Sequence, residues 1–113
     1  MPEAGDGAVQ EVTTAAEQLH KDRVARLGCV VCLRVHDCYT PPELHHVAEG
    51  SGIRSDFAIA PLCRAHHTGT SGFHKRGSEF LKQFRVPGES EYGLIIWTNE
   101  DLARYDLFRG RRD

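Results

Sequence analysis

The apolar pattern predicts an amphipathic helix in the first quarter of the chain. From residue 9 to residue 27, apolar side chains recur at roughly helical spacing, at Val12, Ala16, Leu19, Val24 and Leu27. Gly28 follows directly, where a helix commonly ends because glycine adopts the left-handed conformation without strain. The residues before position 9 are rich in glycine and acidic side chains, and we expect residues 1–8 to form a disordered tail.

Two short apolar stretches in the middle of the chain predict a β-hairpin. Pro41 and Pro42 disfavour helix, so residues 43–47 begin as an extended segment and form the first candidate strand. Residues 57–62 carry a run of apolar side chains and form the second. We expect the two strands to pair in the antiparallel sense across a loop at residues 48–56.

Helical spacing returns after the hairpin. Four apolar side chains fall at i, i+7, i+8 and i+11, which is one face of a helix, namely Phe73, Phe80, Leu81 and Phe84. We expect Gly77 to let this helix pack closely and residues 86–88 (Val-Pro-Gly) to end it. Residues 91–105 predict a further helix, although residues 94–97 suit a strand equally well. The mainly basic residues 109–113 are expected to form a solvated tail.

Length and composition fit one small globular domain. The chain has 113 residues, of which 40% are hydrophobic and 27% charged, a balance that argues against disorder over the whole chain. We expect a single domain over residues 9–108, with its core motif at residues 28–85. No apolar run approaches a membrane span, and no secretory signal is visible. These features predict a cytoplasmic protein without membrane contacts, whose four cysteines are thiols or metal ligands rather than disulfides.

Charge is distributed unevenly along the chain. Residues 1–22 carry five acidic side chains against one lysine, and residues 86–113 carry six against four arginines. Residues 23–85, in contrast, carry nine lysines or arginines against five acidic side chains. A basic middle segment between acidic flanks favours local contact with a polyanion. The charge pattern alone, however, does not identify nucleic acid as that partner.

Two pairs of metal-ligand residues stand on either side of the predicted hairpin. Cys29 and Cys32 form a Cys-x2-Cys pair, and Cys63 and His66 form a Cys-x2-His pair. This spacing lets both side chains of a pair reach one ion at about 2.0–2.3 Å, and four such ligands form a tetrahedral zinc site. We expect a structural Zn²⁺ in the arrangement of a treble-clef site. Cys38 is an alternative fourth ligand in place of His66, and a further alternative is that the cysteines are ordinary buried thiols.

Four more histidines lie close to these pairs, at His45, His46, His67 and His74. Adjacent residues of a strand point to opposite faces, so one of His45 and His46 is expected to face a second ion, and a shift of one residue in register would exchange them. His67 and His74 are too far apart to share an ion on a straight helix. Two intervening glycines allow a loop that brings them together.

The order of these residues resembles the HNH, or ββα-metal, endonuclease motif. The Cys-x2-Cys pair is followed by Glu-Leu-His-His and then by Pro-Leu-Cys-x2-His-His-x6-His. The run Pro-Leu-Cys-x2-His-His-Thr-Gly, with the later Gly-Phe-His, is similar to the phage recombination-enhancing, RecA-dependent nucleases and their prophage relatives. The resemblance covers residues 20–85. It implies an α+β fold: a small treble-clef zinc domain with a ββα-metal core (antiparallel hairpin plus helix) and flanking helices.

The resemblance also implies roles for individual residues. His46 matches the general base of the motif. The loop at residues 48–56 has no asparagine where the middle letter of the motif would stand, so Asp56 or a backbone group is expected to orient His46. A catalytic metal ion would be bound by His45, His67 and His74, and the structural zinc by Cys29, Cys32, Cys63 and His66.

The implied function is metal-dependent hydrolysis of DNA phosphodiester bonds in a bacterial host cell, by a phage- or prophage-encoded enzyme. Imidazole ligands suit Zn²⁺ or Ni²⁺, while Mg²⁺ or Mn²⁺ can also serve because phosphate and water complete the shell. The basic residues nearest the motif are the candidate DNA contacts, namely Arg54, Arg64, Lys75 and Arg76. A recombinase filament is a further implied partner, although the first 22 residues here are acidic where the phage nuclease has a basic arm.

The alternative function is that of a non-catalytic treble-clef zinc module that binds nucleic acid or protein. Such a module needs only its four structural ligands. A zinc module does not require His46 or His74, whereas the nuclease requires both, so these two residues discriminate between the two functions.

Overall fold

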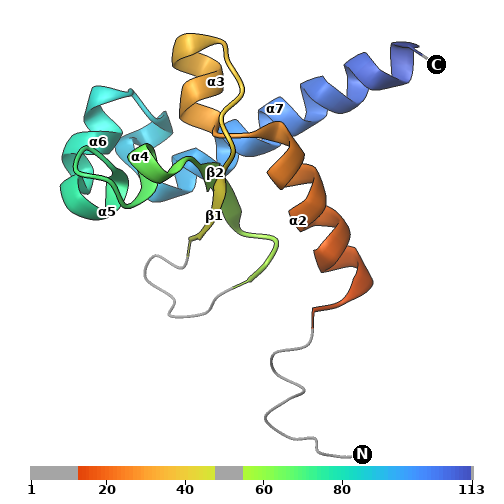
Figure 1. Ribbon diagram of the computed structural model, residues 1–113, viewed down its shortest axis with the longest axis horizontal. Coiled ribbons are helices and arrows are strands. Elements are labelled where there is room, and N and C mark those ends of the chain that lie inside the picture. The colour runs from red at the N-terminus through yellow and green to blue at the C-terminus, as the bar shows by residue number, and fades with distance from the viewer. Residues whose placement is uncertain (1–12, 48–54, 113) are drawn as a thin grey trace, which may run out of the picture.

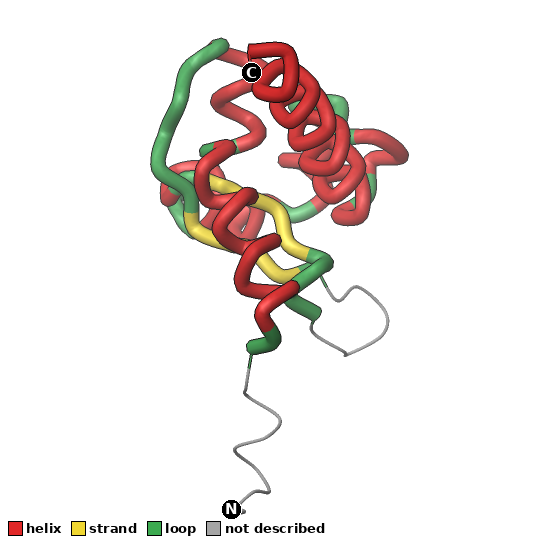
Figure 2. The backbone as a smooth tube through the Cα atoms, turned by 90° about the vertical axis from the view of Figure 1, so that its right-hand side faces the viewer, coloured by secondary structure: helices red, strands yellow, loops and turns green. Residues whose placement is uncertain are grey.

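A two-stranded sheet lies at the centre of the computed structural model, with helices around it (Figure 1). The structure describes residues 13–47 and 55–112, with the backbone alone for residues 107–112. Figure 2 shows α2 (Ala15–Leu27) lying across the hairpin, and the long helix α7 (Glu91–Arg112) contacts both α2 and the sheet. None of the helices in the described part of the chain is long and apolar enough to cross a membrane.

Helix α2 begins at a capping box and ends at a glycine. The Glu17 N–H donates to Oγ1 of Thr14 at 3.1 Å, and the Thr14 N–H donates to the Glu17 carboxylate at 2.8 Å. Gly28 adopts a φ of +84°, and a Cβ at this position would lie 2.6 Å from the Tyr39 ring. The predicted helix end is therefore confirmed. The predicted helix start and the tail before it lie outside the described residues.

Helix α3 (Val30–His36) is an element that the apolar pattern does not predict. Cys29 caps it, because the Cys32 N–H donates to the Cys29 sulfur at 3.5 Å. Val30 and Val31 are fully buried. Since β-branched residues have only modest helix propensity, burial rather than propensity stabilises this short helix.

Strands β1 (Glu43–His46) and β2 (Ile59–Leu62) form the predicted antiparallel hairpin. The register places His45 opposite Ala60. Residues 48–54 of the intervening loop lie outside the described residues. The hairpin brings the Glu-Leu-His-His segment next to the strand that leads into the second ligand pair.

Three short helices follow the hairpin: α4 (Arg64–His67), α5 (Phe73–Arg76) and α6 (Ser78–Gln83). The single helix predicted from Phe73 to Phe84 is wrong, because Gly77 adopts a φ of +55° and separates α5 from α6. Close packing does not explain this glycine, since a Cβ there would meet nothing within 4 Å. Its role is the backbone conformation. The predicted apolar grouping is nevertheless correct, because Phe80 and Leu81 are buried and the two outer phenylalanines pack against them.

Helix α7 follows a 3₁₀ turn, η1 (Pro87–Glu89). The helix predicted over this part of the chain is confirmed. The strand alternative is wrong, because Leu94 and Trp97 are buried from one face of a continuous helix. The backbone stays helical over residues 109–112, where a solvated tail is expected from the sequence; the side chains of these residues lie outside the description.

Strand β2 separates two clusters of buried side chains. On one side, Ile59 packs against α2 and α7, with Val24, Leu27 and Leu102. On the other side, Ala60 and Leu62 belong to a larger cluster that includes residues of α3, α6 and α7 together with Cys29, Cys32 and Cys63. The apolar face predicted for α2 is correct only in its second half, because Leu19 is 58% exposed.

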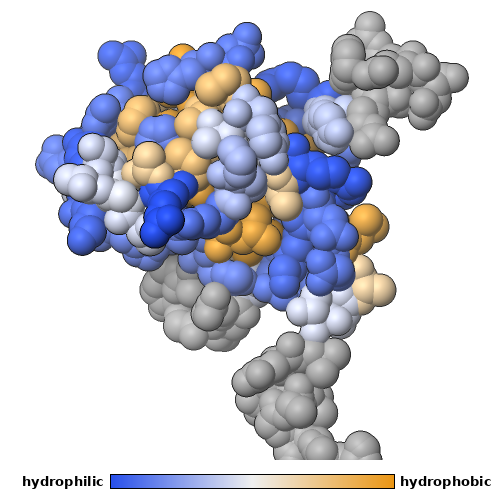
Figure 3. Space-filling model, viewed as in Figure 1, coloured by the Kyte–Doolittle hydropathy of each residue, from blue (hydrophilic) through white to orange (hydrophobic). Residues whose placement is uncertain are grey.

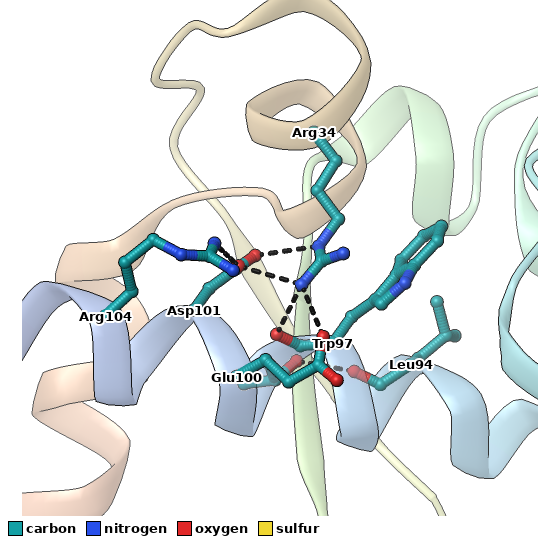
Figure 4. Close-up of polar contacts among 7 residues, drawn as sticks. Arg34, Leu94, Trp97, Glu100, Asp101 and Arg104 are labelled. Carbon is teal, nitrogen blue, oxygen red and sulfur yellow. Dashed lines mark hydrogen bonds and ion pairs between the residues drawn. The ribbon is translucent and has the colours of Figure 1, made fainter.

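A buried carboxylate ties α3 to α7 (Figure 4). The Asp101 side chain is 2% exposed and accepts hydrogen bonds from Arg34 Nε at 3.0 Å and Nη2 at 2.9 Å. The same guanidinium donates to Glu100 and lies 4.9 Å from the ring centroid of Trp97. Arg104, whose side chain is 71% exposed, donates to Asp101 from the solvent side. A cavity of about 690 Å³ opens beside this ion pair, and none of the predicted metal ligands lines it.

We expect Arg34→Ala to lower the free energy of unfolding by about 3 kcal/mol, because it removes the bidentate partner of a buried carboxylate. Arg104→Ala is the matched control, since it removes an exposed donor to the same carboxylate and should cost less than about 1 kcal/mol. Urea unfolding followed by circular dichroism measures both values. An equal loss of unfolding free energy in the two variants would contradict the conclusion that Arg34 is the main partner of the buried Asp101 carboxylate.

Candidate functional site

Four candidate ligands of one metal ion converge between α3 and α4. Cys29 precedes α3 and Cys32 lies in its first turn, while Cys63 precedes α4 and His66 lies within it. Each residue offers one ligand atom, and these four atoms lie within 4.8 Å of one another. The structure therefore brings the two sequence-predicted pairs to one point. We refer to these four residues as the cysteine-rich group.

The spacing of these atoms fits a tetrahedral ion. Zinc–sulfur bonds of about 2.3 Å and zinc–nitrogen bonds of about 2.1 Å place neighbouring tetrahedral ligands about 3.5–3.8 Å apart. The sulfurs of Cys32 and Cys63 lie 3.8 Å apart, and Nδ1 of His66 lies between 3.3 and 3.6 Å from the three sulfurs. Three sulfurs and one imidazole form a donor set that zinc prefers. The residues present thus fit a closed metal site.

Cys38 lies apart from this group. It is exposed, and its sulfur lies 4.0 Å from the Thr40 hydroxyl. Nδ1 of His66 stands in the fourth position beside the three buried sulfurs. The geometry therefore favours His66 over Cys38 as the fourth candidate ligand.

Burial changes the chemistry of the thiols. It raises the pKa of the Cys29 thiol to about 12, and it also raises the pKa of Cys32. Both thiols are neutral near pH 7 in the absence of a cation. An ion that binds them must displace their protons, so the affinity of the group for metal is expected to rise with pH.

A second group of candidate ligands consists of three imidazoles, which we call the histidine trio: His45 of β1, His67 of α4 and His74 of α5. His45 Nδ1 lies 3.2 Å from His67 Nε2, and His74 Nε2 lies 3.0 Å from the same atom. Two nitrogens bound to one ion at about 2.1 Å lie about 3.0–3.4 Å apart. The trio thus fits one ion while leaving coordination positions for further ligands.

Helix α4 sends two neighbouring histidines to different groups. Successive residues of a helix are rotated by about 100°, so His66 turns to the sulfurs and His67 turns to the hairpin. The chain then folds back, and Gly72 lies so close to α4 that a Cβ would be 2.8 Å from the His67 carbonyl oxygen. This return brings His74 to the trio, as the two glycines after α4 predict.

Two carboxylates determine how the imidazoles point. Glu91 Oε2 lies 2.5 Å from His45 Nε2, and Glu43 Oε1 lies 2.8 Å from His67 Nδ1. A carboxylate only accepts, so these two ring nitrogens carry protons. When both rings are neutral, the nitrogens that face each other, His45 Nδ1 and His67 Nε2, therefore carry lone pairs. Two lone pairs 3.2 Å apart repel each other unless a cation lies between them, which fits a metal ion better than a hydrogen bond between the rings.

Sequence reasoning missed both carboxylates. Glu43 stands two residues before His45 on the same strand, and strand alternation places it on the same face, so a signal was present. Glu91 is the first residue of α7 and lies 46 positions after His45. No local pattern in the chain connects these two residues.

Two imidazoles of the trio, those of His45 and His74, are suited to bind metal in their neutral form. Burial is the main cause that lowers the pKa of His45 to about 4, and the nearby imidazoles of His67, His74 and His46 lower it further. Burial, followed by the charge of His67, also lowers the pKa of His74. His45 and His74 are therefore neutral near pH 7, with lone pairs available to a cation.

His46 points to the side of β1 opposite His45, as strand alternation requires. Its Nε2 lies 2.8 Å from Asp56 Oδ1, and Lys21 Nζ lies 3.9 Å from the second oxygen of that carboxylate. The hydrogen bond from His46 is the main cause that lowers the pKa of Asp56. Asp56 thus stands where a group that orients His46 is expected from the sequence.

The predicted DNA contacts that the structure describes lie on the helices of the histidine trio. Arg64 is exposed on α4 and Lys75 is exposed on α5. Arg76, also on α5, donates to the side chain of Gln83. Arg54 lies outside the described residues. The two exposed cations are therefore placed near the trio, while Arg76 is engaged within the protein.

Further positive charge is found in and just after helix α6, which contacts α5. Lys82 and Arg85 are exposed at and just after α6, and sequence reasoning did not single them out. In Figure 3, hydrophilic residues lie along the left edge of the view, where Figure 1 places α4, α5 and α6, with apolar residues among them. This region therefore offers several cations to a polyanion.

One family model matches a part of the chain that includes both the cysteine-rich group and the histidine trio. A family model described as "recombination enhancement, RecA-dependent nuclease" matches residues 13–106. No curated protein and no solved structure matches the chain significantly.

We expect Cys63→Ser to lose one equivalent of zinc per chain and to be strongly destabilised, because structural zinc supplies folding free energy in small domains. Cys38→Ser makes the same chemical change at an exposed sulfur outside the cysteine-rich group. It should keep both zinc content and melting temperature. Elemental analysis and thermal unfolding of the purified variants provide the measurements. A Cys63→Ser protein with full zinc content and an unchanged melting temperature would rule out a structural zinc in this group.

Proposed function

The chain belongs to the recombination enhancement, RecA-dependent nuclease family, and we propose that it is a metal-dependent HNH endonuclease that hydrolyses DNA phosphodiester bonds. Family membership indicates a nuclease that acts on DNA and in relation to RecA. The histidine trio is the observation that supports the more specific proposal of a metal-dependent HNH endonuclease. Its nitrogens converge, and two carboxylates fix the protons of two of its rings so that lone pairs face a common point.

The two ligand groups have different tasks in this proposal. The cysteine-rich group supplies four ligands, which closes the shell of a structural Zn²⁺ and leaves no position for substrate. The hairpin and α4, fixed by that ion, form the treble-clef core. The histidine trio supplies only three ligands and leaves positions open for water and phosphate, which a catalytic ion requires.

The ion bound by the trio would polarise the scissile phosphate and stabilise the negative charge that develops on the leaving oxygen. Neutral imidazoles suit Zn²⁺ and Ni²⁺ best, and Mg²⁺ or Mn²⁺ can serve when phosphate and water supply oxygen ligands. The surrounding residues then hold the substrate. In this proposal the exposed side chains of Arg64 and Lys75 contact phosphates, and such contacts give little sequence preference because they do not read bases.

His46 is the general base in this proposal. Because its Nε2–H is donated to Asp56, the basic lone pair of the ring lies on Nδ1. Nδ1 accepts a proton from the attacking water, and the Asp56 carboxylate stabilises the imidazolium that results. His46 directly follows the trio member His45 in β1. Asp56 acts through His46 and does not itself take the proton.

The alternative of a non-catalytic zinc module is less well supported. A module of that kind uses only the cysteine-rich group. It gives no reason for three imidazoles to converge at a second point, or for two carboxylates to orient them.

We expect His46→Ala to reduce DNA cleavage by about 10²–10⁴-fold, which is the contribution of a general base. Asp56→Asn should cause a smaller loss, because the amide still orients the ring but no longer stabilises its positive charge. A plasmid-nicking assay with added divalent metal measures both. His36→Ala, which removes an exposed histidine outside both ligand groups, is the control and should cleave like the unaltered protein.

Zinc content and melting temperature should be the same in all of these proteins, so that a loss of cleavage reports on chemistry rather than folding. If His46→Ala nicks the plasmid as fast as the unaltered protein, the proposed role of His46 is wrong. If none of the proteins cleaves DNA with any divalent metal, the non-catalytic module is the better description.

A further inference from the structure

We infer that Glu91 is a positioning residue for the ion of the histidine trio, which makes the last helix a part of the candidate active site. This inference rests on the proposed function, because it concerns the same site. It goes beyond that function in naming a residue outside the Cys/His motif on which metal binding depends.

The first observation is the contact itself. Glu91 Oε2 lies 2.5 Å from His45 Nε2 although the two residues are 46 positions apart. The bond is largely shielded from water, since the side chains are 17% and 4% exposed. A carboxylate in this position keeps the proton on Nε2 and directs the lone pair of Nδ1 toward the ion. Such partners of metal-binding histidines strengthen metal affinity.

The second observation is a difference between the two carboxylates of the site. Glu43 makes the equivalent bond to His67, but its side chain is 46% exposed. Water can replace an exposed acceptor, and solvent screens its charge. The buried Glu91 is therefore expected to contribute more to metal affinity than Glu43 does.

The third observation is the charge of the site. Three neutral imidazoles leave the double charge of a divalent ion unbalanced, and the two carboxylates balance it. Because His45 is nearly inaccessible to solvent, water near this residue contributes little to neutralising the charge of the ion. Removing the charge of Glu91 is therefore expected to weaken ion binding even where the hydrogen bond is kept.

The position of Glu91 is fixed by the packing of α7. Two residues later, Gly93 lies so close to η1 that a Cβ would be 2.3 Å from the Pro87 carbonyl oxygen. Leu94 and Trp97 then lie in the larger core cluster. The start of α7 is therefore held rigidly against the site, as a positioning residue requires.

The test measures Ni²⁺ binding by isothermal titration calorimetry in the purified full chain that retains its zinc. We expect Glu91→Ala to weaken Ni²⁺ binding by about 10–100-fold, the usual effect of removing such a partner. Glu91→Gln keeps a hydrogen-bond acceptor but not the charge and should give a smaller loss. Glu43→Gln should have the least effect. Glu89→Gln alters an exposed carboxylate just before α7 and should bind Ni²⁺ like the unaltered protein.

Melting temperatures without added Ni²⁺ separate positioning from a merely structural role. A Glu91→Gln protein that binds Ni²⁺ as tightly as the unaltered chain overturns the inference, and so does a variant that loses thermal stability but keeps its Ni²⁺ affinity. Should Glu91→Ala fail to fold, the comparison of Glu91→Gln with Glu43→Gln still decides whether Glu91 positions His45.

If the unaltered chain binds no Ni²⁺ beyond its zinc, the proposed function fails as well. If it binds Ni²⁺ in the expected order of variants but cleaves no DNA, the inference stands and the proposed function fails.

Discussion

The packing of three buried sulfurs and one imidazole around a single point is the constraint on which the rest of this structure depends. The elements that it joins are too short to be stable alone: α3 has seven residues and α4 has four. Burial raises the pKa of the Cys29 and Cys32 thiols, and the sulfurs are surrounded by apolar side chains. An ion bound there would link α3 to the end of β2 and to α4, and its binding free energy would add to the stability of the fold. The cysteine-rich group therefore sets the position of α4 relative to the hairpin.

The candidate active site follows from that position. One turn of helix directs His66 into the cysteine-rich group and His67 toward β1, so fixing the first imidazole also fixes the second. β1 contributes His45 to the trio from its buried side and holds His46 against Asp56 on the other side. The last helix closes the site through a carboxylate that contacts His45. An ion in the cysteine-rich group would thus organise a second, more open group of ligands, and the two groups share no residue.

The local parts of this arrangement could be predicted from the sequence, and the long-range parts could not. Ligand spacing and strand alternation predict the two pairs, the hairpin and the divergence of His45 from His46, because each depends on neighbours in the chain. Helix α3 was missed because the Cys-x2-Cys spacing indicates a tight metal-binding turn rather than a helix, and only the cap at Cys29 and burial stabilise the helix. The continuous helix through Gly77 was wrong because apolar periodicity does not report a positive φ. The contact of Glu91 with His45 and the ion pair of Arg34 with Asp101 join distant segments, for which a single sequence carries no local signal.

The most direct test of two separate ions is anomalous X-ray scattering from crystals of the full chain that retain zinc and are soaked in Ni²⁺. Data collected on both sides of each metal's absorption edge locate the two elements independently. We expect a zinc peak among the sulfurs of Cys29, Cys32 and Cys63, and a separate nickel peak among the nitrogens of His45, His67 and His74. A single peak per chain, with the three imidazoles turned away from one another, would contradict the proposal of two ions.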